Sequence, residues 1–148
     1  MPGSVATVDV RPARDRSELE QALALRERVF CGEQGVDPGA DRDGLDGEAL
    51  QIVAAEGGRV VGTCRVLMRD GVARLGRMAV EPDLRGRGIG ARLLDEAERG
   101  ALAAGATLVR LHAQAAAVPL YARGGYAAVG EPFVEEGIDH VTMERALA

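Results

Sequence analysis

Aromatic residues are scarce in this chain of 148 residues: they make up 3% of it, and tryptophan is absent. The core must therefore be built mostly from Val, Leu, Ile and Ala. No apolar stretch approaches the roughly 20 residues that a membrane helix needs. The N-terminus also lacks the basic segment and apolar run of a signal peptide. These absences lead us to expect a cytoplasmic protein that does not span a membrane.

Cysteine is rare, with two residues, and the chain has no net positive charge. Cys31 and Cys64 are not spaced like metal ligands and are expected to be small core or near-surface residues. The formal net charge is -5, which gives no broad electrostatic basis for binding nucleic acid or an anionic membrane. Arg85, Arg87 and Arg92 nevertheless lie close together in the sequence, which allows one local anion site.

The hydropathy pattern predicts one domain, residues 1–148, that mixes strands and helices. A strand over residues 5–10 precedes a helix that begins at Ser17, with Glu20 in a capping box, and a long loop over residues 31–47. Asp70-Gly71 is a strong hairpin signal. The other elements are predicted as strands over residues 51–55, 59–68, 72–80, 107–111, 126–133 and 138–143, a helix from Ile89 that ends at Gly105, and a short helix over residues 115–123.

This order of elements predicts an α/β fold, classed as α+β in some schemes. The sheet should be mixed, with about seven strands flanked by helices and a parallel crossover around the helix at Ile89.

The most informative segment is Arg-Gly-Arg-Gly-Ile-Gly at residues 85–90, between a predicted strand and a predicted helix. Glycine allows a tight turn and a close approach of a ligand, and the amides of the first helical turn favour an anion. A pyrophosphate would suit this loop, although a plain turn into a helix also uses glycine. The preceding meander disfavours a Rossmann fingerprint, and the absence of Gly-Lys-Ser/Thr disfavours a Walker A loop.

Three segments, in order and spacing, resemble the GNAT superfamily of N-acetyltransferases. They are the loop Arg85-x-x-Gly88-x-Gly90, the preceding residues 77–82, and the residues 121–126. Further segments at residues 26–34, 111–114 and 136–140 resemble the ElaA-like subgroup. The resemblance covers residues 25–143, and it departs at Gln51, near which many members carry a histidine.

The resemblance implies acetyl-CoA as a cosubstrate and a fourth and fifth strand that splay apart to admit its thioester. The backbone around Met78, Ala79 and Val80 would line the pantetheine arm, and Gln114 could hydrogen-bond CoA or the acceptor. The pyrophosphate would lie on the backbone amides of Arg85, Gly86, Arg87, Gly88, Ile89, Gly90 and Ala91.

The resemblance also gives candidate catalytic residues and no metal. The hydroxyl of Tyr121 would lie near the CoA sulfur and protonate the leaving thiolate. For the base there are two candidates: Glu33, where the first helix enters the long loop, and His112, because histidine changes charge near neutral pH. His140 and the Glu135-Glu136 pair could line the acceptor side, or they could belong to a solvated turn.

The long loop contains Asp41, Asp43 and Asp46. These residues lack the spacing and the terminal glutamate of a calcium loop, so a solvated acidic loop is expected. Such a loop would suit a cationic amine.

The predicted function is an N-acetyltransferase that moves an acetyl group from acetyl-CoA to a primary amine by direct attack in a ternary complex. The alternative is a non-catalytic acyl-CoA-binding sensor or scaffold module. The sequence leaves the identity of the amine, the use of other acyl groups and a homodimer open.

Overall fold

Two tight turns fold the middle of the chain into an antiparallel meander. The turn at Gly57-Gly58 and the turn at Asp70-Gly71 both have positive φ at their two central residues, which matches the twist of the flanking strands. The three strands joined in this way are β2 (Leu50–Glu56), β3 (Arg59–Arg69) and β4 (Val72–Val80). The predicted hairpin and the predicted bounds of the third strand are confirmed.

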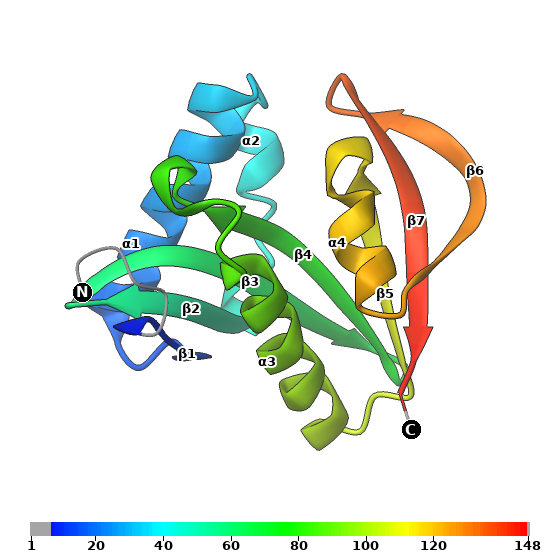
Figure 1. Cartoon of the computed structure of the whole chain (residues 1–148), viewed down its shortest axis with the longest axis horizontal. Helices are drawn as coiled ribbons and strands as arrows, with labels where there is room; N and C mark the ends of the chain where they lie inside the picture. The colour runs from blue at the N-terminus through cyan, green and yellow to red at the C-terminus, as the bar shows by residue number, and fades with distance from the viewer. Residues whose placement is uncertain (1–6, 148) are drawn as a thin grey trace.

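The computed structural model describes residues 7–147, which form a seven-stranded mixed sheet in the order β1-β2-β3-β4-β5-β7-β6 (Figure 1). β5 runs parallel to β4, while the other neighbouring pairs are antiparallel. This arrangement confirms the predicted fold. The strands outside the meander are β1 (Asp9–Pro12), β5 (Leu108–Gln114), β6 (Ala127–Glu135) and β7 (Ile138–Ala146), of which β1 and β6 lie at the edges.

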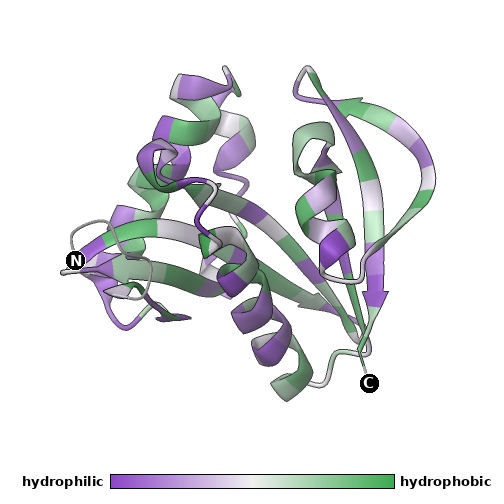
Figure 2. Cartoon of the chain, viewed as in Figure 1, coloured by the Kyte–Doolittle hydropathy of each residue, from purple (hydrophilic) through white to green (hydrophobic). Residues whose placement is uncertain are grey.

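Helices cover both faces of the sheet. Alternate residues of β2 face opposite ways: Val53 packs in one cluster with Leu25 of α1, while Ile52 packs in the other cluster with Leu93 of α3. Green and purple bands alternate along α3 in Figure 2, as expected of a helix with one buried face. The helices are α1 (Arg16–Arg26), α2 (Pro38–Asp41), α3 (Ile89–Ala103) and α4 (Val118–Arg123), with 3-10 turns at Asp46–Glu48, Pro82–Leu84 and Ala115–Ala117.

Gly62 of β3 sets the close contact between the sheet and α3. A Cβ atom at this position would lie 3.1 Å from side-chain atoms of both Ile89 and Leu93. A larger residue would therefore push α3 away from the sheet.

Several predicted boundaries were wrong because local signals compete with tertiary pairing. The first strand begins at Asp9, and residues 5–6 of its predicted range lie outside the described residues. α1 begins before Ser17, because Asp15 accepts a hydrogen bond from the Glu18 amide at 2.9 Å and acts as the N-cap. β5 and β7 extend beyond their predicted ends because they pair with each other from Leu108 to Gln114.

The predicted long loop contains much more regular structure than expected. α1 continues into a π-helical segment (Glu27–Glu33), and α2 follows it. None of the helices within residues 7–147 combines the length and apolar character needed to cross a lipid bilayer.

The expectation of three solvated aspartates was wrong for Asp41, which is buried, and for Asp46, which is partly buried, whereas Asp43 is exposed and bound by arginines. Asp41 is 3% exposed and Arg26 is fully buried. Arg26 donates to the carboxylate of Asp46 at 2.6 Å and to the Asp41 carbonyl at 3.0 Å. Arg65 binds Asp43 and Asp46, and Arg77 binds Asp43. We call these six residues the arginine–aspartate network; it fastens the segment to β3 and β4.

Removing one arginine of the network should destabilise the protein strongly. We expect Arg26→Leu to lower the free energy of unfolding by about 3 kcal/mol, because buried carboxylates would lose their main partner. Urea unfolding measures the loss. Arg42→Leu is the matched control: Arg42 is half exposed, and its ion pairs are longer, at 3.8 and 3.9 Å. A similar loss in both variants would mean that the network does not carry this stability.

The start of α1 should respond to acid through Glu18. Bonds from the Arg11 guanidinium, at 2.7 Å, and from the Arg14 amide, at 2.8 Å, hold the pKa of Glu18 at about 2, against an ordinary value of 4.5. The stabilisation is therefore complete above pH 4.5 and is lost as the pH falls toward 2.

We expect Glu18→Gln to lower the free energy of unfolding by about 1–2 kcal/mol at neutral pH. The deficit relative to the wild type should shrink across that acidic range, as measured by denaturant unfolding at several pH values. Glu20→Gln, on the same helix but exposed, should change little at any pH. A deficit that stays constant with pH would contradict this assignment.

Candidate functional site

The strands β4 and β5 pair over only four residues each. The parallel pairing runs from Val72–Leu108 to Leu75–Leu111 and then stops, although β4 continues to Val80 and β5 to Gln114. Figure 1 shows the two strands meeting at one end and diverging toward the other. A cleft of about 620 Å³ lies between them, lined by both strands and by the segments on either side of the sheet.

A β-bulge at Arg77 accompanies this divergence. The register between β3 and β4 shifts between Thr63 and Arg65, where β4 holds one extra residue. Arg77 has a φ of 54°, a left-handed conformation that is uncommon for residues other than glycine. Its guanidinium donates to the carbonyls of Ala40 and Asp41 at 3.2 and 3.3 Å. The bulge is therefore held in place by the network.

The bulge leaves backbone groups of β4 facing the cleft. The Glu81 amide donates to Val61 of β3 at 2.8 Å, so the Val80 carbonyl, across the same planar peptide, points the other way. That carbonyl accepts from the Arg85 side chain at 3.1 Å. Ala79 pairs with Thr63 of β3, so its backbone N–H and C=O groups point toward β3. The backbone groups of successive residues in a strand point to opposite edges, so those of Met78 point toward the cleft. The backbones of Met78 and Val80, but not that of Ala79, therefore face the cleft.

The glycine-rich loop brings the N-terminus of α3 to the same cleft. Gly86 and Gly88 have φ values of 79° and 84°, and a Cβ at either would meet nothing within 4 Å. Backbone conformation, not crowding, therefore requires glycine here. Gly88 is the N-cap of α3, with no side-chain cap and no acidic residue in the first turn. The first-turn amides, from Ile89 to Ala91, suit an anion.

Arg85 and Glu33 form a bidentate ion pair, at 2.7 and 2.9 Å, beside this loop. The hydrogen bonds from Arg85 lower the pKa of Glu33, and Glu33 is not among the residues that line the cleft. The structure thus brings Glu33 to the loop rather than to the open space between the strands.

Tyr121 lies at the wall of the cleft on the α3 face. Its ring is almost fully buried, and its hydroxyl lies 3.7 Å from the Met78 sulfur. Burial raises the pKa of this hydroxyl well above its ordinary value. Tyr126, predicted to be a core residue, is buried and donates to Glu98 at 2.8 Å.

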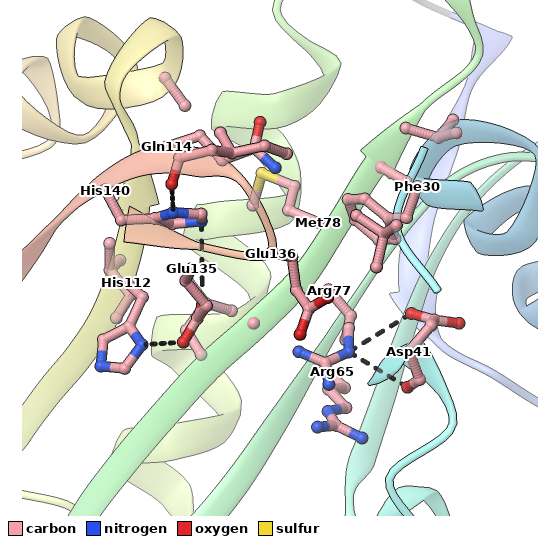
Figure 3. Close-up of a pocket in the computed structure, with 18 of the residues that line it drawn as sticks. Phe30, Asp41, Arg65, Arg77, Met78, His112, Gln114, Glu135, Glu136 and His140 are labelled. Carbon is pink, nitrogen blue, oxygen red and sulfur yellow. Dashed lines mark hydrogen bonds and ion pairs between the residues drawn. The ribbon is translucent and has the colours of Figure 1, made fainter. Parts of the chain in front are cut away.

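Two histidines flank one carboxylate on the opposite side of the cleft (Figure 3). Nδ1 of His112 lies 3.2 Å from Oε1 of Glu135, and Nε2 of His140 lies 3.8 Å from Oε2. Nδ1 of His140 lies 2.7 Å from the Ile138 carbonyl and can only donate to it. If Nδ1 of His112 donates to Glu135, its Nε2 can accept a proton.

A pair of glutamines bridges the two walls at the wide end of the cleft. Gln34, just after the π-helical segment, and Gln114, at the end of β5, exchange two side-chain hydrogen bonds of 3.2 and 2.9 Å. Gln114 was predicted to lie at the site, whereas Gln34 was recognised only as part of the family segment.

The sequence also left Arg74 and Arg110 unassigned, although both line the cleft. For Arg110, the alternation of polar residues along β5 could have predicted this position. Arg110, His112 and Gln114 occupy every second position, so their side chains leave the same face of the strand. Gln51, where the family resemblance was expected to depart, donates to Asp46 at 3.0 Å and extends the network.

Comparisons with known proteins agree with this geometry. A family model described as "Acetyltransferase (GNAT) domain" matches residues 18–147. The "Uncharacterized N-acetyltransferase YjcF" of Bacillus subtilis is 36% identical over 132 residues, which cover 88% of this chain and 94% of that protein.

Solved structures agree as well. An acyl-CoA N-acyltransferase from Pseudomonas aeruginosa has a TM-score of 0.81 and 31% identity, with coverage of 94% of this chain and 98% of that one. ElaA from Escherichia coli has a TM-score of 0.81 and 29% identity, with coverage of 93% and 97%. The family model, the similar sequence from Bacillus subtilis and the solved structures all indicate the same family. The chain therefore belongs to the GNAT family of acetyltransferases.

Proposed function

We propose that this protein is an N-acetyltransferase that moves the acetyl group of acetyl-CoA to a primary amine by direct attack in a ternary complex. The observation that carries the proposal is the gap between β4 and β5, which opens beside the N-terminus of α3. A thioester can enter this gap from one face of the sheet while an amine approaches from the other. Membership of the family supports acyl transfer in general.

The α3 face fits the phosphate-bearing part of acetyl-CoA. The amides of the loop 85–88 and of the first turn of α3 would hold the pyrophosphate, since no acidic side chain lies in that turn. The backbones of Met78 and Val80 would pair with the pantetheine arm, with Gln114 as a further hydrogen-bond partner. Bound acetyl-CoA would supply the activated acyl group.

The opposite face would receive the amine. Residues such as Arg65, Gly76 and His112 line the cleft there, together with Phe30 of the π-helical segment. The three aspartates nearby are already bound by arginines, so the acidic segment offers little free charge for a cation. A net charge of -5 favours a small amine over nucleic acid.

The candidate proton-transfer groups lie on opposite sides of the gap. A lysine-type amine has a pKa near 10.4, so it must lose a proton before it attacks. We assign this step to His112, oriented by Glu135. Tyr121 is protonated at neutral pH, since the ordinary pKa of tyrosine is about 10 and burial raises it further, and its hydroxyl would be the hydrogen-bond and proton donor to the departing thiolate. Glu33, held by Arg85, would position the phosphate loop.

The loop can be tested with Gly88→Glu. We expect acetyl-CoA binding, measured by isothermal titration, to fall below detection, because a carboxylate would occupy the anion site and the left-handed conformation would be strained. Gly58→Glu is the control: its φ of 82° is close to the 84° of Gly88, but it lies in the β2–β3 turn. Undiminished binding in Gly88→Glu would remove the central support for acetyl-CoA at this loop.

The proton donor can be tested with Tyr121→Phe. We expect kcat for amine acetylation to fall by about 10²-fold or more, with acetyl-CoA affinity unchanged. Tyr126→Phe, which removes a hydroxyl that faces Glu98 instead of the cleft, should retain its rate. Acetyl-CoA binding without CoA release, for any amine of a broad panel, would instead favour the sensor or scaffold module.

A further inference from the structure

Two arginines lie side by side at the narrow end of the cleft. Arg74 of β4 and Arg110 of β5 are register partners, one residue before the last pair of the parallel ladder. Partners in a ladder direct their side chains to the same face of the sheet. Their neighbours Ala73 and Leu75 pack in the cluster that contains α3, so both arginines leave the opposite face, where the amine would enter.

Arg74 differs from the other arginines of the cleft in having no counter-charge. Arg65 and Arg77 bind Asp43, and Arg85 binds Glu33. Arg110 donates through Nε to Glu144 at 2.5 Å. The side chain of Arg74 makes no hydrogen bond or ion pair with any residue between 7 and 147.

Like charges directly across a ladder destabilise a sheet. Glu144 binds Arg110 through only one nitrogen, Nε, and no carboxylate of the described residues pairs with the neighbouring Arg74 guanidinium. An anion in the cleft would complete the charge balance, and a guanidinium can bind a carboxylate or phosphate through two parallel hydrogen bonds.

We propose that Arg74, together with Arg110, binds an anionic group of the acceptor, so that the substrate is a primary amine that also carries a carboxylate or a phosphate. This inference rests on the proposed function and names its substrate class. Two carboxylates, Glu135 and Glu136, line the cleft at the hairpin between β6 and β7. The cleft thus matches a molecule with a cationic end and an anionic end.

The position of Arg74 sets the separation of the two ends. Arg74 precedes Met78 by four residues, one of which belongs to the bulge, which corresponds to about 10 Å of strand. An ω-amino acid, in which several carbons separate amine and anion, therefore fits better than an α-amino acid.

The test is a titration of the protein, saturated with CoA, with three probes of similar length: 6-aminohexanoate, 6-aminohexyl phosphate and hexylamine. We expect at least one anionic probe to bind the wild type about tenfold or more tightly than hexylamine. Arg74→Gln should abolish this preference and leave hexylamine binding unchanged, and Arg110→Gln should weaken it. The stronger of the two anionic probes identifies whether the site takes a carboxylate or a phosphate.

Arg69→Gln is the matched control. Arg69 is an exposed arginine at the end of β3, bound to Glu48 and outside the cleft lining, so this variant should keep the wild-type preference. Equal affinity of the wild type for all three probes, binding of none, or a preserved preference in Arg74→Gln would each overturn the anion site. The proposed function is judged separately, by acetyl-CoA titration and by CoA release, so that the two can fail independently.

Discussion

The early end of the pairing between β4 and β5 is the constraint on which the rest of the site depends. After Leu75 and Leu111 the strands separate, and backbone groups in the middle of the sheet lose their partners. Unpaired buried backbone groups cost free energy, so such a gap persists only if other parts of the fold hold it open. On one side, β5 pairs with β7 along the whole length of β5, from Leu108 to Gln114. On the other side β3 pairs with β4 around the bulge, and Arg85 satisfies the Val80 carbonyl.

The bulge and the arginine–aspartate network share Arg77, so the contacts of the network also hold the bulge. The left-handed conformation at Arg77 is strained, and its guanidinium is fixed by two carbonyls and by Asp43. The same aspartate binds Arg65 of β3, while Arg26 of α1 binds Asp41 and Asp46. One wall of the cleft is therefore tied to α1, β3 and β4 together. A buried ion pair is costly to break but adds little net stability over well-packed apolar side chains, so its larger effect here is to fix the shape of the site.

The sequence predicted the parts of this structure that depend on local chemistry. Glycines with positive φ marked the hairpin at Asp70-Gly71 and the loop before α3, and the apolar period marked α3 itself. Features that depend on distant partners were missed. The aspartates looked solvated because Arg26 and Arg65 lie 15 to 22 residues away from them, and Glu33 looked free because Arg85 lies 52 residues away. A carboxylate in the sequence does not reveal whether an arginine has already bound it.

The chain has no lysine, and arginine supplies all 18 of its basic side chains. This composition would suit the proposed reaction, in which an activated acyl group meets a base. A lysine beside the cleft would itself be an amine, and its pKa shifts readily on burial, so it could compete with the substrate for the acyl group. A guanidinium stays protonated at all relevant pH values and has no lone pair to offer. Arg74 and Arg110 can therefore present positive charge on the amine face of the gap, next to the path of the reaction, without becoming acceptors. In the proposed reaction, binding of an anion and resistance to acylation would both follow from the use of arginine.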